Sequence, residues 1–324
     1  MIAEQVQGRY RLTRLAPSPT GALHPGNART FLINWALAKQ NGWRILLRIE
    51  DLDTPRVKAG ADVLAIEDLR WLGLDWDVGP VYQKADLGPC EQALKTLGER
   101  GLIYPCKCTR RQIRKALSAP HGDEHETRYP GTCRPGNSET VPPYRATLDR
   151  AWRLIVPDEQ LVFEDAVRGR QSRNVQRQVG DFVVATKLGL PAYQLAVVVD
   201  DARQGVTDIV RGDDLLDSTA RQLWLYRFLE PGERPCYWHL PLVVGEDGRR
   251  LAKRHGDTRL ARFREAGVRA ERIVGLLARW SGVTQTRHEL TTGEFAERFR
   301  LDRLPPEQVV FTQKDREWLM DGRR

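Results

Sequence analysis

The sequence lacks any hydrophobic run that approaches the ~18 apolar residues typical of a membrane span. Its first residues, Met-Ile-Ala-Glu-Gln-Val-Gln, have neither the basic segment nor the apolar core of a secretory signal peptide. Cysteine is scarce, and five cysteines form an odd, sparse set that argues against a disulfide framework. No Gly-x-Gly-x-x-Gly fingerprint follows a predicted strand, which disfavours a dinucleotide oxidoreductase. We therefore expect a cytoplasmic protein with no membrane partner.

What is present suits a basic globular protein. The chain has 324 residues, enough for two or three packed units, and 41% of them are hydrophobic. Lys and Arg number 51 against 43 Asp and Glu, a formal net charge of +8. Such a balance favours a polyanionic partner, of which nucleic acid is the commonest, although it also serves solubility. Two basic stretches, 110–115 and 168–177, could hold RNA phosphates or be solvated surface.

The stretch from residue 10 to residue 41 predicts a strand, a tight loop and a helix. The apolar run 10–16 is strand-like, and a helical pattern begins after His24, Gly26 and Asn27. A helix N-terminus presents free backbone N–H groups and a positive dipole end, which suit a phosphate. His24 can add a hydrogen bond to a phosphoryl oxygen. An ordinary strand-to-helix turn would have the same spacing.

A second strand-like run, 45–49, ends in the carboxylates Glu50, Asp51 and Asp53. Ligands of open α/β sheets lie at the carboxyl ends of the strands, where acids can bind an amino group or a ribose hydroxyl. The alternative is that Asp51 or Asp53 caps a helix.

Other elements are predicted from hydrophobic spacing. Helices are expected over 62–73, 87–100 and 271–280, with another around 295–301. The run 195–199 is the strongest buried-strand signal in the chain. We also expect a strand over 205–211, a turn at Gly212, a helix capped by an acidic or Ser/Thr residue, and a strand over 237–244.

Three cysteines are grouped as Cys106-x-Cys108 and Cys133, which suggests zinc in a basic protein without disulfides. Zinc requires a fourth ligand, and general preference favours His121 or His125. The site would be structural, because four protein ligands leave no position for a reacting water. Three thiols without a metal are the alternative.

Three motifs carry a resemblance to a known family. Arg14-x-Ala-Pro-Ser-Pro-Thr-Gly with His24-x-Gly26-Asn27 resembles the nucleotide-binding signature of class I aminoacyl-tRNA synthetases, in its glutamyl form. Leu-Arg-Ile-Glu50-Asp-x-Asp-x-x-Arg matches the same family. Arg-Leu-Ala-Lys253-Arg resembles its second signature. Departures from the usual motifs are Pro25, Asn27, Arg250 and Ala252.

The resemblance implies a role for each matching position. It implies that His24 and Lys253 are catalytic and that ATP, with Mg²⁺, is bound by His24, Gly26, Asn27 and Lys253. The residues implied for glutamate are Arg14, Leu15, Ala16, Pro17, Ser18, Glu50, Tyr193 and Arg211. Arginine suits this role because its fork matches a carboxylate with two hydrogen bonds.

The arrangement Cys-x-Cys…Tyr129-x-x-x-Cys133 is similar to that of the glutamyl-Q tRNA(Asp) synthetases, short paralogues of the glutamyl enzymes. This resemblance implies Tyr129 as the fourth zinc ligand, with His125 second. It also implies that glutamate is activated and attached to queuosine in the anticodon stem-loop of tRNA(Asp). A compact glutamyl-tRNA(Glu) synthetase and a non-catalytic zinc-bearing RNA-binding module are the alternatives.

The expected fold is α/β: a Rossmann-like class I synthetase core with an inserted zinc-bearing, acceptor-type subdomain and a helical C-terminal segment. Segments 1–103 and 176–256 would form the core, 104–175 the insertion and 257–324 the helical part. Full-length glutamyl synthetases continue into a helical anticodon-binding domain, which we expect to be absent here. We expect a monomer.

Overall fold

The computed structural model of the protein describes residues 10–53, 55–109, 111–113, 128–136, 139–146, 148–249, 251 and 258–321. The chain forms two compact units. The first comprises Met1–Tyr82, Val206–Asp214 and Cys236–Arg324, and the second comprises Gln83–Gly205 and Leu215–Pro235. These bounds follow packing and differ from the four segments expected from the sequence, which stay a prediction.

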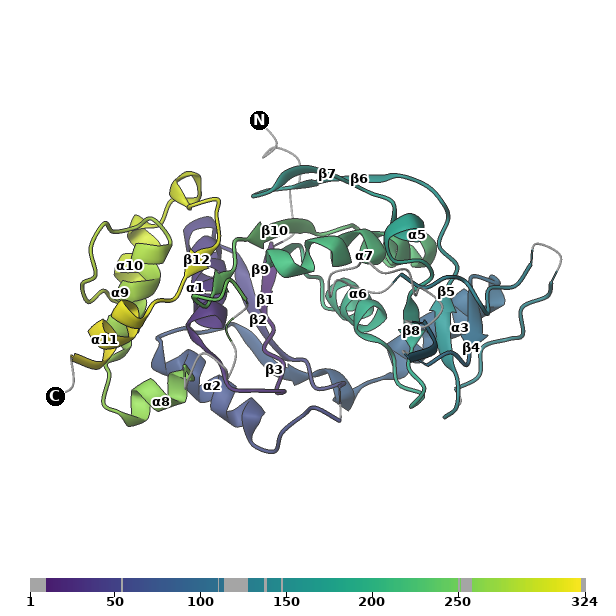
Figure 1. Cartoon of the computed structure of the whole chain (residues 1–324), viewed down its shortest axis with the longest axis horizontal. Coiled ribbons are helices and arrows are strands. Elements are labelled where there is room, and N and C mark those ends of the chain that lie inside the picture. The colour runs from purple at the N-terminus through teal and green to yellow at the C-terminus, as the bar shows by residue number, and fades with distance from the viewer. Residues whose placement is uncertain are drawn as a thin grey trace. The chain divides into compact units, whose positions relative to one another are not determined.

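The first unit contains a parallel sheet with the strand order β3-β2-β1-β9-β10 (Figure 1). The strands are β1 (Leu12–Leu15), β2 (Arg44–Ile49), β3 (Val78–Tyr82), β9 (Asp208–Gly212) and β10 (Cys236–Leu240). Strand β2 is buried at five consecutive positions, as expected for a parallel strand covered on both faces. The predicted Rossmann-like arrangement is confirmed.

The order of these strands reverses between β1 and β9. From β1 the chain passes through α1 (Pro25–Asn41) to β2 on one side, whereas β9 pairs with β10 on the other. In open α/β sheets, ligands bind at the carboxyl ends of the strands at this switch point. The segments after β1, β2 and β9 are therefore where a ligand site is expected.

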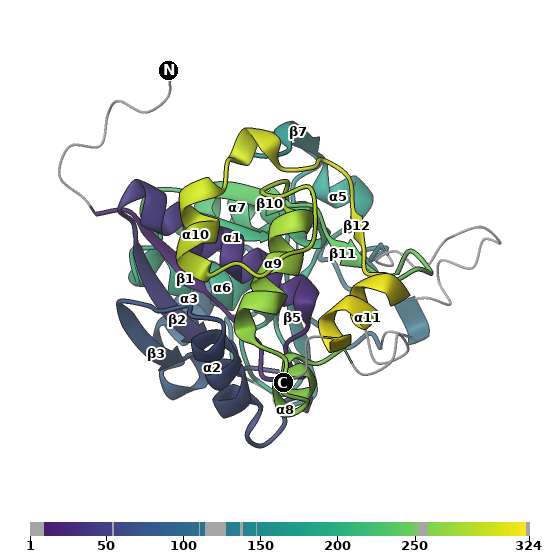
Figure 2. The same ribbon diagram turned by 90° about the vertical axis from the view of Figure 1, so that its left-hand side faces the viewer.

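The remaining helices of the first unit are α2 (Ala61–Trp71), α8 (Leu260–Glu265), α9 (Ala270–Trp280), α10 (Thr292–Arg298) and α11 (Gln313–Asp321). Helices α9 and α10 pack against α1 (Figure 2). Arg29 of α1 is buried and donates hydrogen bonds to the carbonyls of Pro241 and Trp280, at 2.7 and 3.1 Å. The short strands β11 (Val243–Val244) and β12 (Val309–Val310) pair in parallel. The C-terminal helices are thus joined to the sheet of this unit.

The second unit contains an antiparallel three-stranded sheet, β4-β5-β8, and the antiparallel strand pair β6-β7. Its strands are β4 (Ile103–Cys106), β5 (Ala151–Leu154), β6 (Leu161–Asp165), β7 (Gly169–Arg173) and β8 (Val183–Ala185). Its helices are α3 (Gly88–Glu99), α5 (Val175–Gln178), α6 (Tyr193–Arg203) and α7 (Leu216–Leu229). Among the described helices of both units, none has the length and apolar character needed to cross a bilayer.

Three expectations about local structure are wrong. The run 195–199 lies in α6, where every residue from Leu195 to Asp201 is buried, so its apolar residues show no helical periodicity. Helix α7 has no side-chain cap, because a 3₁₀ turn over Asp213–Leu215 leads into it. The strand expected over 237–244 is divided at Pro241, which has no N–H to donate to a sheet.

Candidate functional site

Arg14 lies on β1 beside the switch point and is almost fully buried. Its Nη1 donates to the carbonyl oxygen of Val210 on β9, at 3.3 Å. Asn34 of α1 holds the strand in place, since its amide nitrogen donates to the Arg14 carbonyl at 2.9 Å and its oxygen accepts from Thr13 at 2.8 Å. The guanidinium of Arg14 is therefore set against β9, one residue before Arg211.

Arg211, on β9, is buried and oriented by side chains of β10. Its Nε donates to Nε2 of His239 at 3.0 Å, and the two residues are direct neighbours in the strand register. The Arg211 guanidinium also lies 5.5 Å from the ring centroid of Tyr237, and that ring stacks on His239. Because Nε2 of His239 accepts this bond, a neutral ring carries its proton on Nδ1. Nothing in the sequence pointed to His239, because the pairing of β9 with β10 is a tertiary feature.

Glu50 follows β2, where the sequence placed it. Its backbone N–H donates to the Pro17 carbonyl at 3.1 Å, and its Oε1 lies 3.2 Å from Nη2 of the fully buried Arg48. Helix α2 begins after Gly60, so neither neighbouring aspartate caps it. The carboxylate is thus fixed near the carboxyl end of β2.

The stretch 15–18 leads from β1 toward this edge of the sheet. Leu15 and Pro17 are buried, whereas Ser18 is exposed. Ala16 lies between them and is half-buried.

His24 is the N-cap of α1, and this differs from the expected phosphate cradle. Its Nδ1 accepts hydrogen bonds from the backbone N–H groups of Gly26 and Asn27, at 3.1 and 3.3 Å. The Asn27 side-chain oxygen accepts in return from the His24 N–H, which completes a capping box. The expectation that these backbone donors are free is wrong. Acceptance at Nδ1 places the proton of a neutral ring on Nε2, so His24 can still act as a hydrogen-bond donor.

Two further residues expected at the site are Tyr193 and Lys253. Tyr193 begins α6 in the second unit and is 40% exposed. Lys253, with Arg250 and Ala252 of the second signature, lies outside the described residues. The roles predicted for them stay predictions.

The three grouped cysteines come together in the second unit. Their sulfur atoms lie within 4.8 Å of one another, and those of Cys108 and Cys133 are 3.6 Å apart. Sulfur ligands at ~2.3 Å from a tetrahedral zinc ion lie about 3.8 Å apart, so this spacing fits a common metal centre. The hydroxyl oxygen of Tyr129 lies 3.5 Å from the Cys106 sulfur, on the same cluster. These residues could hold a metal; His121 and His125 lie outside the described residues.

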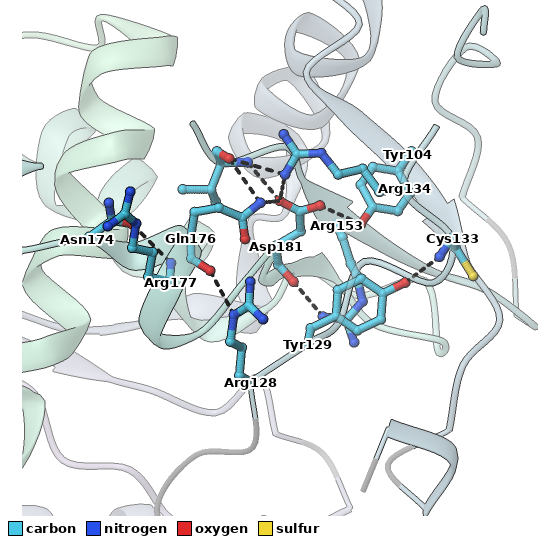
Figure 3. A network of polar contacts seen from close by, with 11 residues as sticks. Tyr104, Arg128, Tyr129, Cys133, Arg134, Arg153, Asn174, Gln176, Arg177 and Asp181 are labelled. Carbon is cyan, nitrogen blue, oxygen red and sulfur yellow. Dashed lines mark hydrogen bonds and ion pairs between the residues drawn. The ribbon is translucent and has the colours of Figure 1, made fainter. Parts of the chain in front are cut away.

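The tyrosine oxygen is held at the cluster by the backbone, since the Cys133 N–H donates to it at 2.8 Å (Figure 3). Burial raises the pKa of the Cys108 thiol to about 11, aided by the neighbouring thiols. Burial also acts to raise the pKa of Cys133, but hydrogen bonds from the Lys107 backbone and the Tyr129 hydroxyl outweigh it and lower that pKa. The Cys133 thiol is therefore more readily converted to a thiolate ligand than the Cys108 thiol.

The sequence is similar to known proteins over nearly its whole length. A family described as tRNA synthetases class I (E and Q), catalytic domain, matches residues 12–318. Glutamyl-Q tRNA(Asp) synthetase of Rhodopirellula baltica is 48% identical over 282 residues, which cover 83% of this chain and 84% of that protein. The protein of the same name from Symbiobacterium thermophilum is 45% identical over 310 residues, which cover 91% of this chain and 94% of that protein.

A solved structure shows the same architecture. A glutamate tRNA ligase from Elizabethkingia meningosepticum, in complex with its amino acid, superposes with a TM-score of 0.79 at 26% identity. The match covers 96% of this chain and 69% of that one.

Proposed function

Because the chain belongs to the family of class I tRNA synthetases for glutamate and glutamine, we propose that it activates L-glutamate with ATP and transfers the glutamyl group to queuosine in the anticodon loop of tRNA(Asp). The observation that carries this proposal is the 48% identity to a glutamyl-Q tRNA(Asp) synthetase over most of both chains. The site at the switch point agrees with it, because two arginines and a carboxylate lie at the ends of β1, β2 and β9. A monomer in the cytosol remains our expectation.

In the first step, the α-carboxylate of glutamate attacks the α-phosphorus of ATP and pyrophosphate leaves. Arg14 and Arg211 supply cations for the carboxylates of the amino acid, and Glu50 supplies an anion for its ammonium group. Nε2–H of His24 donates to a phosphoryl oxygen as charge builds there. The enzyme thus acts by positioning and by neutralising charge.

Lys253 provides a separate test of the activation step. If it meets the ATP phosphates, Lys253→Ala should slow glutamate-dependent pyrophosphate exchange while leaving the dependence on glutamate concentration unchanged. An unchanged exchange rate would contradict this role.

We further propose that Cys106, Cys108, Cys133 and Tyr129 bind one structural zinc ion. Bound zinc would cross-link β4 to the loop that carries Tyr129 and Cys133, because its ligands come from both. Elemental analysis should find about one zinc per chain. A metal-free protein that is folded and active would contradict the assignment.

The acceptor is tested by transfer of labelled glutamate to three RNAs: tRNA(Asp) with queuosine, tRNA(Asp) without it, and tRNA(Glu). We expect label only on the first. Labelling of tRNA(Glu) would make the protein a compact glutamyl-tRNA synthetase instead. Absence of pyrophosphate exchange with glutamate and ATP would contradict the activation step itself and favour a non-catalytic RNA-binding protein.

A further inference from the structure

Arg153, on β5, is a buried cation with no carboxylate partner among the described residues. It is 8% exposed, and no acidic side chain of the described residues lies within ion-pair distance of its guanidinium. Its Nη1 donates to the backbone carbonyl of Asp181 at 2.7 Å, and no described residue offers a hydrogen-bond acceptor to its Nε. Arginine stays charged in proteins, so burial at this position costs free energy that some other interaction must offset.

The Asp181 carboxylate does not serve as the counter-ion of Arg153. It forms an ion pair with Arg134 at 2.8 Å and also accepts from the Tyr104 hydroxyl at 2.7 Å. Further hydrogen bonds reach it from the backbone N–H of Val156 at 2.9 Å and from the Gln176 amide at 3.3 Å. The acceptor capacity of this buried carboxylate is thus used by four other donors.

The group that Arg153 does face is the aromatic ring of Tyr129. The guanidinium carbon lies 3.8 Å from the ring centroid, so the cation stacks directly on the face of the tyrosine (Figure 3). The same ring bears the hydroxyl oxygen that lies 3.5 Å from the Cys106 sulfur. A cation on a desolvated aromatic face is stabilised by the ring electrons, and this stabilisation increases if the ring carries negative charge.

A loaded metal centre would supply that charge. Three thiolates and one tyrosinate around a divalent ion would leave a net charge of about −2 in a partly buried site. Arg153 would offset part of this charge through the ligand that it stacks on.

The backbone around Tyr129 supports the same geometry. Its N–H donates to the Val179 carbonyl at 2.7 Å. Gly180 has a φ of +74°, and a Cβ there would lie 2.3 Å from the Tyr129 carbonyl oxygen. Only glycine allows this close approach, which also brings the Asp181 carbonyl to Arg153. The segment 179–181 therefore fixes both the tyrosine and the arginine that covers it.

We propose that Arg153 is a positioning residue of the metal centre: it holds the ring of Tyr129 in place and is the counter-cation that makes the tyrosine oxygen a favourable fourth ligand. This role rests on the zinc site proposed above. Arg153 touches no substrate in this role, and its contribution is to metal affinity.

The test is a competition for Zn²⁺ between the full-length protein and a chromophoric chelator. Arg153→Gln should weaken Zn²⁺ binding ~10–100-fold, as is typical when a residue that supports a metal ligand is removed. Arg153→Lys should restore only part of the affinity, because an ammonium group cannot stack as a planar guanidinium does. Arg128→Gln is the matched control: it removes an exposed arginine of the same network that bonds the Gln176 carbonyl, and affinity should not change.

A double-mutant cycle then shows whether Arg153 acts through Tyr129. In a Tyr129→Phe background, Arg153→Gln should cause a much smaller further loss of affinity. An equal loss in both backgrounds, or wild-type affinity in Arg153→Gln, would overturn the proposal. Because Arg153 is buried, the spectrum of Co²⁺ bound to Arg153→Lys gives a second measurement: an unchanged ligand field together with unchanged affinity would also overturn it.

The zinc assignment and the role of Arg153 fail in different ways. If the wild-type chain binds no Zn²⁺, both are contradicted. If the wild-type chain binds Zn²⁺ and the Arg153 variants bind it with the same affinity, the role of Arg153 is contradicted while the zinc assignment stands.

Discussion

The hydrogen bond between Arg211 and His239 leads to a prediction about glutamate binding. His239→Phe removes the acceptor of the Arg211 Nε–H but keeps an aromatic ring that can stack on Tyr237. Both partners are buried, so the Nε–H loses its acceptor where water is scarce. A hydrogen bond to a charged group is worth ~1.5–3 kcal/mol, which corresponds to a rise in the KM for glutamate of ~10–150-fold.

The assay is ATP–pyrophosphate exchange at varied glutamate concentration. A residue that only orients Arg211 for binding should raise KM while kcat changes little, because the lost interaction is made equally in the ground and transition states. His239→Gln offers an amide oxygen as a substitute acceptor and should recover part of the lost affinity. His288→Gln, on an exposed histidine, is the matched control.

Two results would refute this reasoning. One is an unchanged KM in His239→Phe when thermal melting shows that the variant is folded. The other is a fall in kcat alone, which would place His239 in the chemical step instead of in the orientation of Arg211.

Three further perturbations test other parts of the structure. Asp181→Ala leaves four donors without their acceptor and should lower the free energy of unfolding by ~3–5 kcal/mol in urea titrations, whereas loss of the exposed Asp158 should not measurably change it. Gly26→Ala places a Cβ 3.0 Å from the ring of His24, so it should displace this cap, slow pyrophosphate exchange and cost ~1–2 kcal/mol by thermal melting. Burial raises the pKa of Asp68 to about 6, so the folded state binds the extra proton and stability should fall as pH rises from about 4 to about 6. Asp68→Asn should abolish that slope in melting curves recorded across this range, and an unchanged slope would contradict the assignment.

At the switch point, local sequence patterns predicted the elements that carry Arg14 and Glu50 but not every contact of the site. The motif around Arg14 and the strand before Glu50 are local, and both elements form where the spacing predicted them. The structural position of His24 was predicted only in part, and its catalytic role stays a prediction. Spacing placed it at the start of a helix, but its ring could equally face a ligand or the helix, and the structure shows that it accepts from the helix backbone.

The run 195–199 shows the limit of hydrophobic pattern. An apolar stretch buried on all sides has the same composition in a strand and in a helix, so periodicity cannot distinguish them. The surroundings of this run decide its structure, and they come from segments distant in sequence: α6 packs against α3, α7 and β8.

The sequence by itself determined the family, the parallel core and the candidate ligands, because these depend on short motifs and on local hydrophobic spacing. Only the tertiary structure decided that the sulfur atoms of Cys106, Cys108 and Cys133 meet within 4.8 Å, that Arg211 bonds His239, and that Arg153 covers Tyr129. The physical reason is that these contacts join residues of different strands and loops. Their geometry is set by strand register and by burial, and both depend on the two contacting segments together, not on the sequence of either segment alone.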